Sequence, residues 1–260
     1  MLSGVGPAAI EMGLITAIGD RAEVKIRAVN TGARIVARVQ IQDGMPRYDG
    51  SAQIDGVPGS AAPVELNFMN VAGSSTGAFL PSGNLIDSFE GVEVTCMDVA
   101  MPMVIARAAD FGLTGAETRE ELDANRDFFA KMETVRLAAG AAMGMGDCSR
   151  SVTPKFGLLY PVEGAGHIGA RYFMPWETHP TMAVTGSQAL ASCALTPGTI
   201  ADKMMTIPKE RPAKITLHHL MGEMDVLVDY DMADGQFVHK SAGLVRTARK
   251  LAQGDLFVPA

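Results

Sequence analysis

The stretch from Thr181 to Leu195 constrains the fold of this chain more than any other feature of its sequence. It contains small and apolar residues and no charged residue, and Pro197-Gly198 stops it. This pattern predicts a buried helix, because a helix without a charged face has to be covered by other elements. Another buried helix is predicted over 7–18, where Pro7 would take the first helical position.

Short strands with Gly- and Pro-rich turns surround the two buried helices. Between residues 117 and 143, charged and apolar residues alternate at the spacing of amphipathic helices, with Thr118 and Glu121 as a capping box. The predicted strands are a hairpin over 22–42 that turns at Asn30-Thr31-Gly32, single strands over 63–68, 92–97, 103–107, 156–160 and 170–173, and a closing meander over 214–218, 224–230 and 236–239. The fold class is therefore α+β, with two linked lobes.

Composition narrows the class of protein. The chain has 260 residues, 47% of them apolar and 20% charged, which is enough for a large core. Its net charge of −7 and the lack of a basic cluster argue against a nucleic-acid partner. No apolar run has the length of a membrane helix, and no basic leader precedes the first apolar segment, so we expect a cytoplasmic protein without a membrane partner.

The start of the second buried helix is the first candidate binding site. Thr185-Gly186-Ser187 lies where free backbone N–H groups and the positive end of the helix dipole would hold a carboxylate. The alternative is an ordinary helix start whose small residues serve packing. Ser3-Gly4 precedes the first helix, so the start of that helix is a weaker candidate for the same kind of anion-binding site.

Titratable residues supply further candidates. His179 lies just ahead of the second helix and could carry a proton, although a lone histidine is more often structural. Lys155 follows Cys148-Ser149-Arg150-Ser151, so cations and hydroxyls occur close together for an anion, or else form a solvated loop. His218 and His219 are neighbours in a strand, so their rings face opposite sides and cannot chelate a metal as a pair.

The three cysteines and the glycines indicate no further chemistry. Cys96, Cys148 and Cys193 are widely spaced and form no CxxC pair, so neither a disulfide framework nor a zinc site is expected. Cys96 is predicted in a strand and Cys193 in the buried helix, where both thiols would act as small apolar groups. The glycine-rich segments match neither nucleotide-binding motif.

Several strings together resemble the PrpF family, which contains 2-methylaconitate cis-trans isomerases and 4-oxalomesaconate tautomerases. They begin with residues 1–7 and continue through 54–59, 73–77 and 80–84 to Phe111-Gly112-Leu113-Thr114-Gly115, Pro154-Lys155, His179-Pro180 and Thr185-Gly186. The strings at 91–102 and 146–151 are most similar to the tautomerase branch. The resemblance covers nearly the whole chain.

This resemblance implies a diaminopimelate epimerase-like fold of two pseudo-symmetric lobes, each a curved sheet around a central helix. The remainder of an incomplete first lobe would comprise 1–51 with the return 240–260, and the second lobe would comprise 52–239. The helix starts of both lobes would face a shared cleft. Family members act on small unsaturated tricarboxylates without a metal or an organic cofactor, so we expect none here.

Two departures from the family pattern affect the catalytic base. Relatives with an epimerase activity have a cysteine in each half of the cleft, and the position that matches the second one is Val184. The other cysteine, in a Cys-Gly-Asn string, would come immediately before Met1, together with a segment that contains a lysine of the site. We therefore expect an N-terminally truncated chain whose principal base precedes Met1.

The sequence leads to one functional hypothesis with open alternatives. The chain is predicted to be a cofactor-independent isomerase that tautomerises 4-oxalomesaconate in aromatic-acid catabolism, with a homodimer as the expected assembly. The alternatives are 2-methylaconitate isomerisation in propionate metabolism, an inactive tricarboxylate-binding fragment, and a fragment that aggregates through an open sheet edge. His179 is the candidate proton donor, and the predicted substrate-binding residues are Asp98, Met101, Pro102, Ser151, Lys155, Thr185, Gly186 and Ser187.

Overall fold

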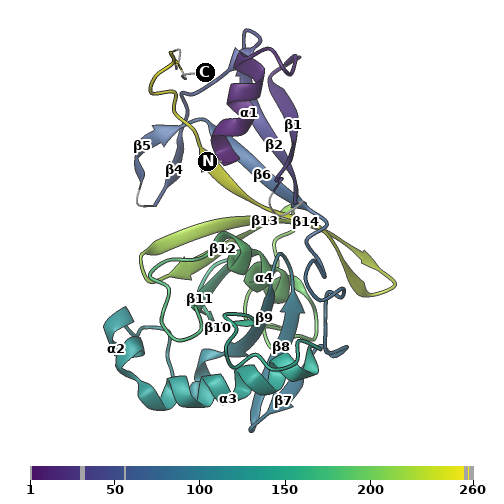
Figure 1. The fold of residues 1–260 in the computed structure, drawn as a ribbon, viewed down its shortest axis with the longest axis vertical. Coiled ribbons are helices and arrows are strands. Elements are labelled where there is room, and N and C mark those ends of the chain that lie inside the picture. Colours follow the sequence, from purple (N-terminus) through teal and green to yellow (C-terminus); the bar gives the residue numbers. More distant parts are fainter. Residues whose placement is uncertain (1, 30–32, 56, 255–256, 258–260) are drawn as a thin grey trace. The chain divides into compact units, whose positions relative to one another are not determined.

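A computed structural model describes residues 2–29, 33–55, 57–254 and 257 of the chain (Figure 1). The chain divides into two compact units. Unit 1 comprises Met1–Asn67 with Val245–Ala260, and unit 2 comprises Phe68–Leu244. These two units are groups of residues that contact one another in the structure. The predicted division into 1–51 with 240–260 and 52–239 instead follows the lobes of the family fold that the sequence resembles. That domain assignment stays a prediction.

Unit 1 consists of one helix and a small group of strands. The predicted hairpin is confirmed, because β1 and β2 pair antiparallel with Arg27 opposite Arg34. Its predicted turn, Asn30-Thr31-Gly32, lies outside the described residues. The elements of this unit are α1 (Leu2–Glu11), β1 (Arg21–Arg27), β2 (Arg34–Gln42), β3 (Met45–Pro46), β4 (Ala52–Ile54), β5 (Val57–Ala61) and most of β6 (Pro63–Met69).

The bounds predicted for the first buried helix, 7–18, are wrong at both ends. Helix α1 already includes Leu2, so Pro7 lies inside it rather than at its first position. The helix stops at Glu11 because Gly13 takes a left-handed φ of 70°. The N–H of Leu14 then donates to the carbonyl of Ala9 at 2.9 Å, which is the long bond of a Schellman motif.

Unit 2 contains a curved mixed sheet in the order β14-β13-β12-β11-β10-β9-β8-β7. The pairs β11–β12 and β9–β10 are parallel, and the other neighbours are antiparallel. These strands are β7 (Asp87–Phe89), β8 (Val92–Asp98), β9 (Pro102–Arg107), β10 (Lys155–Pro161), β11 (His167–Phe173), β12 (Ala213–His219), β13 (Gly222–Ala233) and β14 (Gln236–Thr247). Strand β14 continues beyond the predicted 236–239 because pairing with β13 overrides the weak strand preference of its small residues, Ser241 to Gly243.

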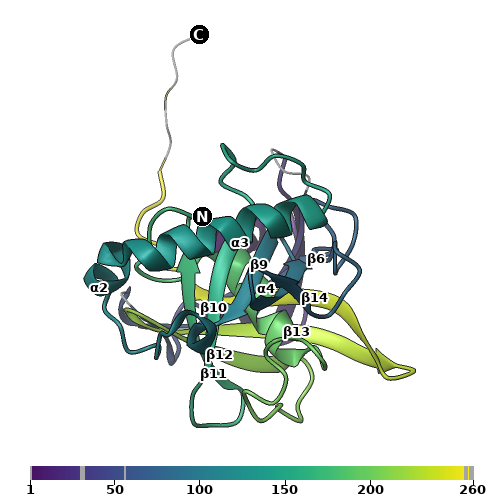
Figure 2. The ribbon, with the colours of Figure 1, turned by 90° about the horizontal axis from the view of Figure 1, so that it is seen from below.

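Helices cover both faces of this sheet. Helix α4 (Val184–Leu195) packs on Met103, Ile105 and other residues of one face, and α3 (Arg126–Ala142) packs on the alternate residues Val104 and Ala106 of the other face. Figure 2 shows α3 lying across β9 and β10. The predicted burial of α4 is confirmed, since its residues from Gly186 to Leu195 are all buried.

The segments that flank α3 and α4 confirm one predicted helix start and correct another. The short α2 (Arg119–Ala124) begins with the predicted capping box, in which Thr118 and Glu121 bond reciprocally. A 3-10 turn (Ala108–Phe111) follows β9. Helix α4 starts at Val184 rather than Thr181, because the N–H of Thr181 donates to His179 Nδ1 and Ala183 is extended.

The structure tests the predicted burial of two cysteine thiols. Cys96 and Cys193 are buried, and burial raises the pKa of both thiols, that of Cys193 to about 12. Both predicted inert cysteines are therefore confirmed as buried apolar groups.

Among the residues that the structure describes, no helix is long and apolar enough to cross a membrane.

His239 on β14 is a histidine that packs among the aromatic rings of unit 2. Its ring lies 6.1 Å from that of Phe79 and 6.4 Å from that of Phe237, between centroids. Within the described part of the chain, neither ring nitrogen has a hydrogen-bond partner. Burial lowers the pKa of His239 from 6.5 to about 4, against a smaller opposing effect of Asp229.

We predict that the free energy of unfolding decreases as the pH falls from 6.5 to 4, because the unfolded chain binds the proton first. This histidine should account for about 3 kcal/mol of that decrease. In urea titrations over this range, His239→Phe should flatten the slope. An unchanged slope in His239→Phe would contradict the prediction.

Candidate functional site

The predicted site residues gather at one edge of the unit 2 sheet. Strands β9 and β10 run parallel, with Lys155 opposite Met103, so both begin at this edge. Strands β8 and β11 run antiparallel to them and therefore end there. The edge thus combines Asp98, Pro102 and Lys155 with the segment that follows β11. The hydroxyl of Thr185 contacts Met101 and brings the start of α4 to the same place.

The start of α4 has the geometry of an anion-binding site. The helix follows an extended Ala183 that supplies no side-chain cap. Its first backbone bond runs from the N–H of Ser187 to the carbonyl of Ala183 at 2.8 Å. The N–H groups of Val184, Thr185 and Gly186 precede this bond, at the positive end of the helix dipole. An anion at this end of the helix would satisfy them.

Hydroxyl groups beside the helix start add further donors. Thr185 Oγ1 donates to Met101 Sδ at 3.3 Å, and the Tyr172 hydroxyl donates to the same sulfur at 3.4 Å. A thioether is a weak acceptor, so an oxygen anion would be the better partner for either group. Burial raises the pKa of Tyr172 to about 12, which keeps its proton in place at neutral pH.

Packing explains the small residues of the helix start. A Cβ on Gly186 would lie 2.3 Å from Tyr172 Cε2, so the ring leaves no room for a side chain. Ser187 is fully buried, and its hydroxyl donates to the carbonyl of Val184 at 2.9 Å. Both donors of Ser187 are thus used inside the helix, which leaves those of Thr185 and Gly186 for a ligand.

Asp98 organises the turn over 73–77 that borders the edge. Its Oδ2 accepts hydrogen bonds from the N–H of Ser75 at 2.8 Å and from the N–H and hydroxyl of Thr76 at 2.7 and 2.9 Å. The residue is fully buried, and Oδ1 has no hydrogen-bond partner among the described residues. Pro102, its partner across the β8–β9 hairpin, is buried as well. The contacts of Asp98 are therefore those of a positioning residue.

His179 packs against the ring of Tyr172, and one of its two ring nitrogens accepts a backbone hydrogen bond. Its Nδ1 accepts the N–H of Thr181 at 3.0 Å, so in the neutral ring Nε2 carries the proton. The ring lies edge-on to Tyr172 with centroids 5.5 Å apart. Burial lowers the pKa of His179, and the charges of Arg119 and Lys155 lower it further. A neutral imidazole of this kind donates a hydrogen bond to a developing oxyanion.

Lys155 supplies a positive charge at the same edge. Burial lowers the pKa of its ammonium group, and the charge of Arg136 adds to this effect. Among the residues that the structure describes, no carboxylate lies within salt-bridge distance of Lys155. An ammonium group that is partly buried without a counter-ion favours an anionic ligand.

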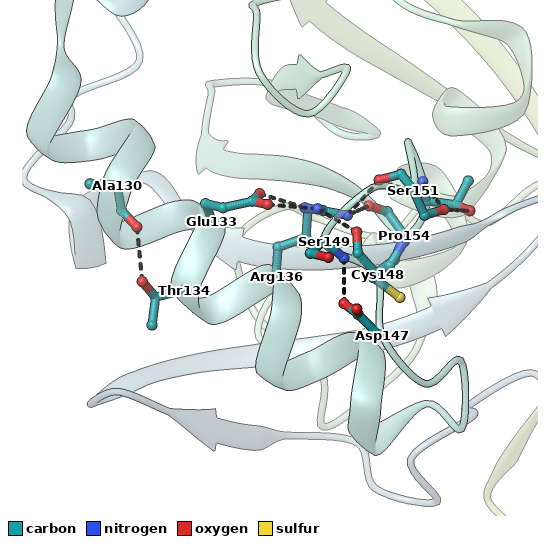
Figure 3. Close-up of polar contacts among 10 residues, drawn as sticks. Ala130, Glu133, Thr134, Arg136, Asp147, Cys148, Ser149, Ser151 and Pro154 are labelled. Carbon is teal, nitrogen blue, oxygen red and sulfur yellow. Dashed lines mark hydrogen bonds and ion pairs between the residues drawn. The ribbon is translucent and has the colours of Figure 1, made fainter.

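Arg136 on α3 fixes the loop that leads to Lys155, and the sequence analysis missed it. Its guanidinium is fully buried and pairs with both carboxylate oxygens of Glu133 at 2.7 Å (Figure 3). It also donates to the backbone carbonyls of Cys148, Ser151 and Pro154. An arginine at the spacing of the apolar face of an amphipathic helix is the signal that could have identified it.

Ser151 belongs to this loop rather than to the helix start. Its hydroxyl shares a hydrogen bond with the hydroxyl of Thr153 at 3.1 Å and also accepts the N–H of Thr153. The structure therefore joins Met101, Thr185, Gly186 and His179 through Tyr172. The charge of Lys155 at the same edge contributes to the lowered pKa of His179. The role of each residue in binding a substrate stays a prediction.

Known proteins are similar to this chain in sequence and in fold. The family model described as PrpF protein matches residues 1–259. YbhH of Escherichia coli strain K12 is 45% identical over 100% of this chain and 73% of its own, and a (4E)-oxalomesaconate Delta-isomerase of Novosphingobium is 44% identical over 99% and 71%. A 2-methyl-aconitate isomerase of Shewanella oneidensis is more distant, at 29%.

A crystal structure of methylitaconate-delta-isomerase superimposes with a TM-score of 0.86 over 96% of this chain and 70% of that one, at 28% identity. The fold and the relatives thus define an isomerase of the class predicted from the sequence. The chain belongs to the PrpF family. The α+β, diaminopimelate epimerase-like fold class implied by the resemblance is confirmed.

We predict that Gly186→Ala lowers the free energy of unfolding by about 1–3 kcal/mol, because the new methyl group overlaps the Tyr172 ring. Gly4→Ala on α1 is the matched control, since a Cβ there meets nothing within 4 Å, and it should stabilise the chain slightly. Urea unfolding measures both variants. A smaller effect of Gly186→Ala in a Tyr172→Val background than in the wild type would identify the ring as the cause, whereas equal effects of the two alanine substitutions would refute it.

Proposed function

We propose that this isomerase converts 4-oxalomesaconate between its keto and enol forms, in the catabolism of aromatic acids. The observation that carries the proposal is the arrangement at the start of α4, where uncapped N–H groups and the Thr185 hydroxyl lie beside Tyr172 and Met101. The relatives named for this substrate support the choice. The proposal includes a cytoplasmic location, which suits three cysteines that are all free thiols.

The substrate is a tricarboxylate, and the edge offers separate donors for separate carboxylates. The start of α4 binds one carboxylate through the N–H groups of Thr185 and Gly186. Lys155 binds another as a cation without a carboxylate partner in the described structure. These local groups allow a chain with a net charge of −7 to bind a polyanion.

Tautomerisation moves a proton between a carbon and the neighbouring oxygen system. When the carbon loses its proton to a base, the electron pair of the C–H bond delocalises onto the carbonyl oxygen, which becomes an enolate. A neutral His179 donates its Nε2–H to this oxygen, and the Tyr172 hydroxyl is a second available donor. Reprotonation on oxygen gives the enol form, and on carbon it regenerates the keto form. Donors fixed before the reaction stabilise this charge without reorganisation.

Isomerisation of 2-methylaconitate is the other substrate hypothesis. It uses the same elements, an allylic proton transfer beside carboxylates, so the geometry at α4 fits both substrates. The greater similarity of the chain to the (4E)-oxalomesaconate Delta-isomerase, at 44% against 29% identity, supports the first choice. Direct competition between the two substrates distinguishes them.

The proposal predicts that the protein interconverts the two forms of 4-oxalomesaconate, followed by ultraviolet absorption. Thr185→Val and Lys155→Met should each lower kcat/KM by about tenfold or more, since each removes a hydrogen bond to a charged group. Thr134→Val and Lys131→Met are matched controls on α3, where the Thr134 hydroxyl donates to the carbonyl of Ala130 and the Lys131 ammonium group donates to the carbonyl of Asp110. Both should keep wild-type activity.

Two results would contradict the proposal. Equal losses in Thr185→Val and Thr134→Val would show that the start of α4 does not bind the substrate. Tricarboxylate binding by calorimetry without turnover, and without exchange of substrate protons into deuterated solvent, would indicate a binding protein and overturn the proposed activity.

A further inference from the structure

Three side chains from neighbouring strands converge at the edge of unit 2 where β11 begins. His167 is the first residue of β11, His218 lies on the adjacent β12, and Glu223 lies opposite His218 on β13. Each offers one ligand atom, and these atoms all lie within 4.8 Å of one another. The sequence analysis set His218 aside because His219 faces the other side of the strand. The partner of His218 is instead His167, 51 residues away in the chain.

The two imidazoles face each other with a carboxylate behind one of them. His167 Nδ1 lies 2.8 Å from His218 Nε2, and the two ring centroids are 5.1 Å apart. The other nitrogen of His218, Nδ1, lies 3.4 Å from Glu223 Oε1. The three residues thus form a line in which the carboxylate orients one imidazole and that imidazole faces the second.

The imidazoles of His167 and His218, with the carboxylate of Glu223 behind His218, are the kinds of groups that surround a divalent metal ion in proteins. Neutral imidazole nitrogens are preferred ligands of Zn²⁺, and two nitrogens of a tetrahedral site are separated by roughly 3.3 Å. The two rings therefore have to separate by about half an ångström to admit the ion. A carboxylate that accepts the far N–H of a ligating histidine fixes its tautomer and increases its basicity, as Glu223 would do for His218.

The surroundings restrain the rings and leave them accessible. A Cβ on Gly164 would lie 3.0 Å from His167 Cδ2, so the backbone of this glycine lies close against the ring. The side chain of His218 is 28% exposed and that of Glu223 is 53% exposed, so solvent reaches the nitrogens and water can complete the coordination.

We propose that His167 and His218 bind a first-row divalent cation, with Zn²⁺ the best fit, and that Glu223 supports His218 from behind. The ion would link β11 to β12. The proposed metal site lies at the start of β11, whereas Tyr172 lies five residues further along the strand, roughly 17 Å away at about 3.3 Å per residue. The role of the ion is thus structural, and it is separate from the proposed tautomerisation.

Calorimetric titration of the metal-free protein with ZnCl₂ tests the proposal. The protein should bind one Zn²⁺ per chain, and its Tm should rise with the metal concentration. His167→Ala and His218→Ala should each weaken binding by more than tenfold, and Glu223→Gln should weaken it by about tenfold. His219→Asn is the matched control and should bind like the wild type, because its side-chain oxygen can still accept the N–H of Met221.

A measurement on the unaltered protein keeps the test valid if a variant fails to fold. Titration with Co²⁺ should produce the visible absorption bands of a nitrogen-ligated ion, and added Zn²⁺ should remove them. The absence of binding by the wild-type protein, or equal Zn²⁺ affinity of wild type and His218→Ala, would overturn the proposal.

Discussion

The burial of α4 from Gly186 to Leu195 is the constraint on which the rest of unit 2 depends. A helix with no charged residue has to be enclosed, and the sheet approaches it closely enough that a Cβ on Gly157 would lie 2.7 Å from Leu190. Tyr172 closes on Gly186 in the same way at the start of the helix. The glycines at positions 157 and 186 are therefore both explained by the close packing around this one buried helix.

The same constraint creates the candidate site. Because α4 begins at a sheet edge without a side-chain cap, its first N–H groups lack the partners that a Ser, Thr, Asp or Asn cap would supply. A missing cap costs about 1 kcal/mol of stability, and an anionic ligand would offset that cost. Lys155 and a neutral His179 lie at the same edge, so the fold concentrates donors there although the whole chain is acidic.

Much of the fold could be predicted from local patterns. The capping box at Thr118 and Glu121 and the β1–β2 hairpin follow from short-range rules, and the structure confirms both. The bounds of α1 could not be predicted from Pro7, because a left-handed Gly13 decides where that helix ends. The length of β14 depends on its pairing with β13, which is a tertiary effect.

The candidate site shows the same division between local and long-range information. Thr185 and Gly186 could be identified because a helix start is a local feature, and the resemblance to a family strengthened that choice. Arg136 holds carbonyls 12 to 18 residues away, and His167 meets His218 across 51 residues, so neither role is visible in a short segment. Only the register of the strands brings such groups together.

The central claim is that the start of α4 binds a carboxylate of the substrate. Amide resonances of the ¹⁵N-labelled protein, followed by NMR while an unreactive tricarboxylate such as citrate is added, test it most directly. The account predicts saturable shifts at Val184, Thr185 and Gly186, with smaller changes on α3 at Thr134. Saturable shifts elsewhere, with these three amides unchanged, would contradict it.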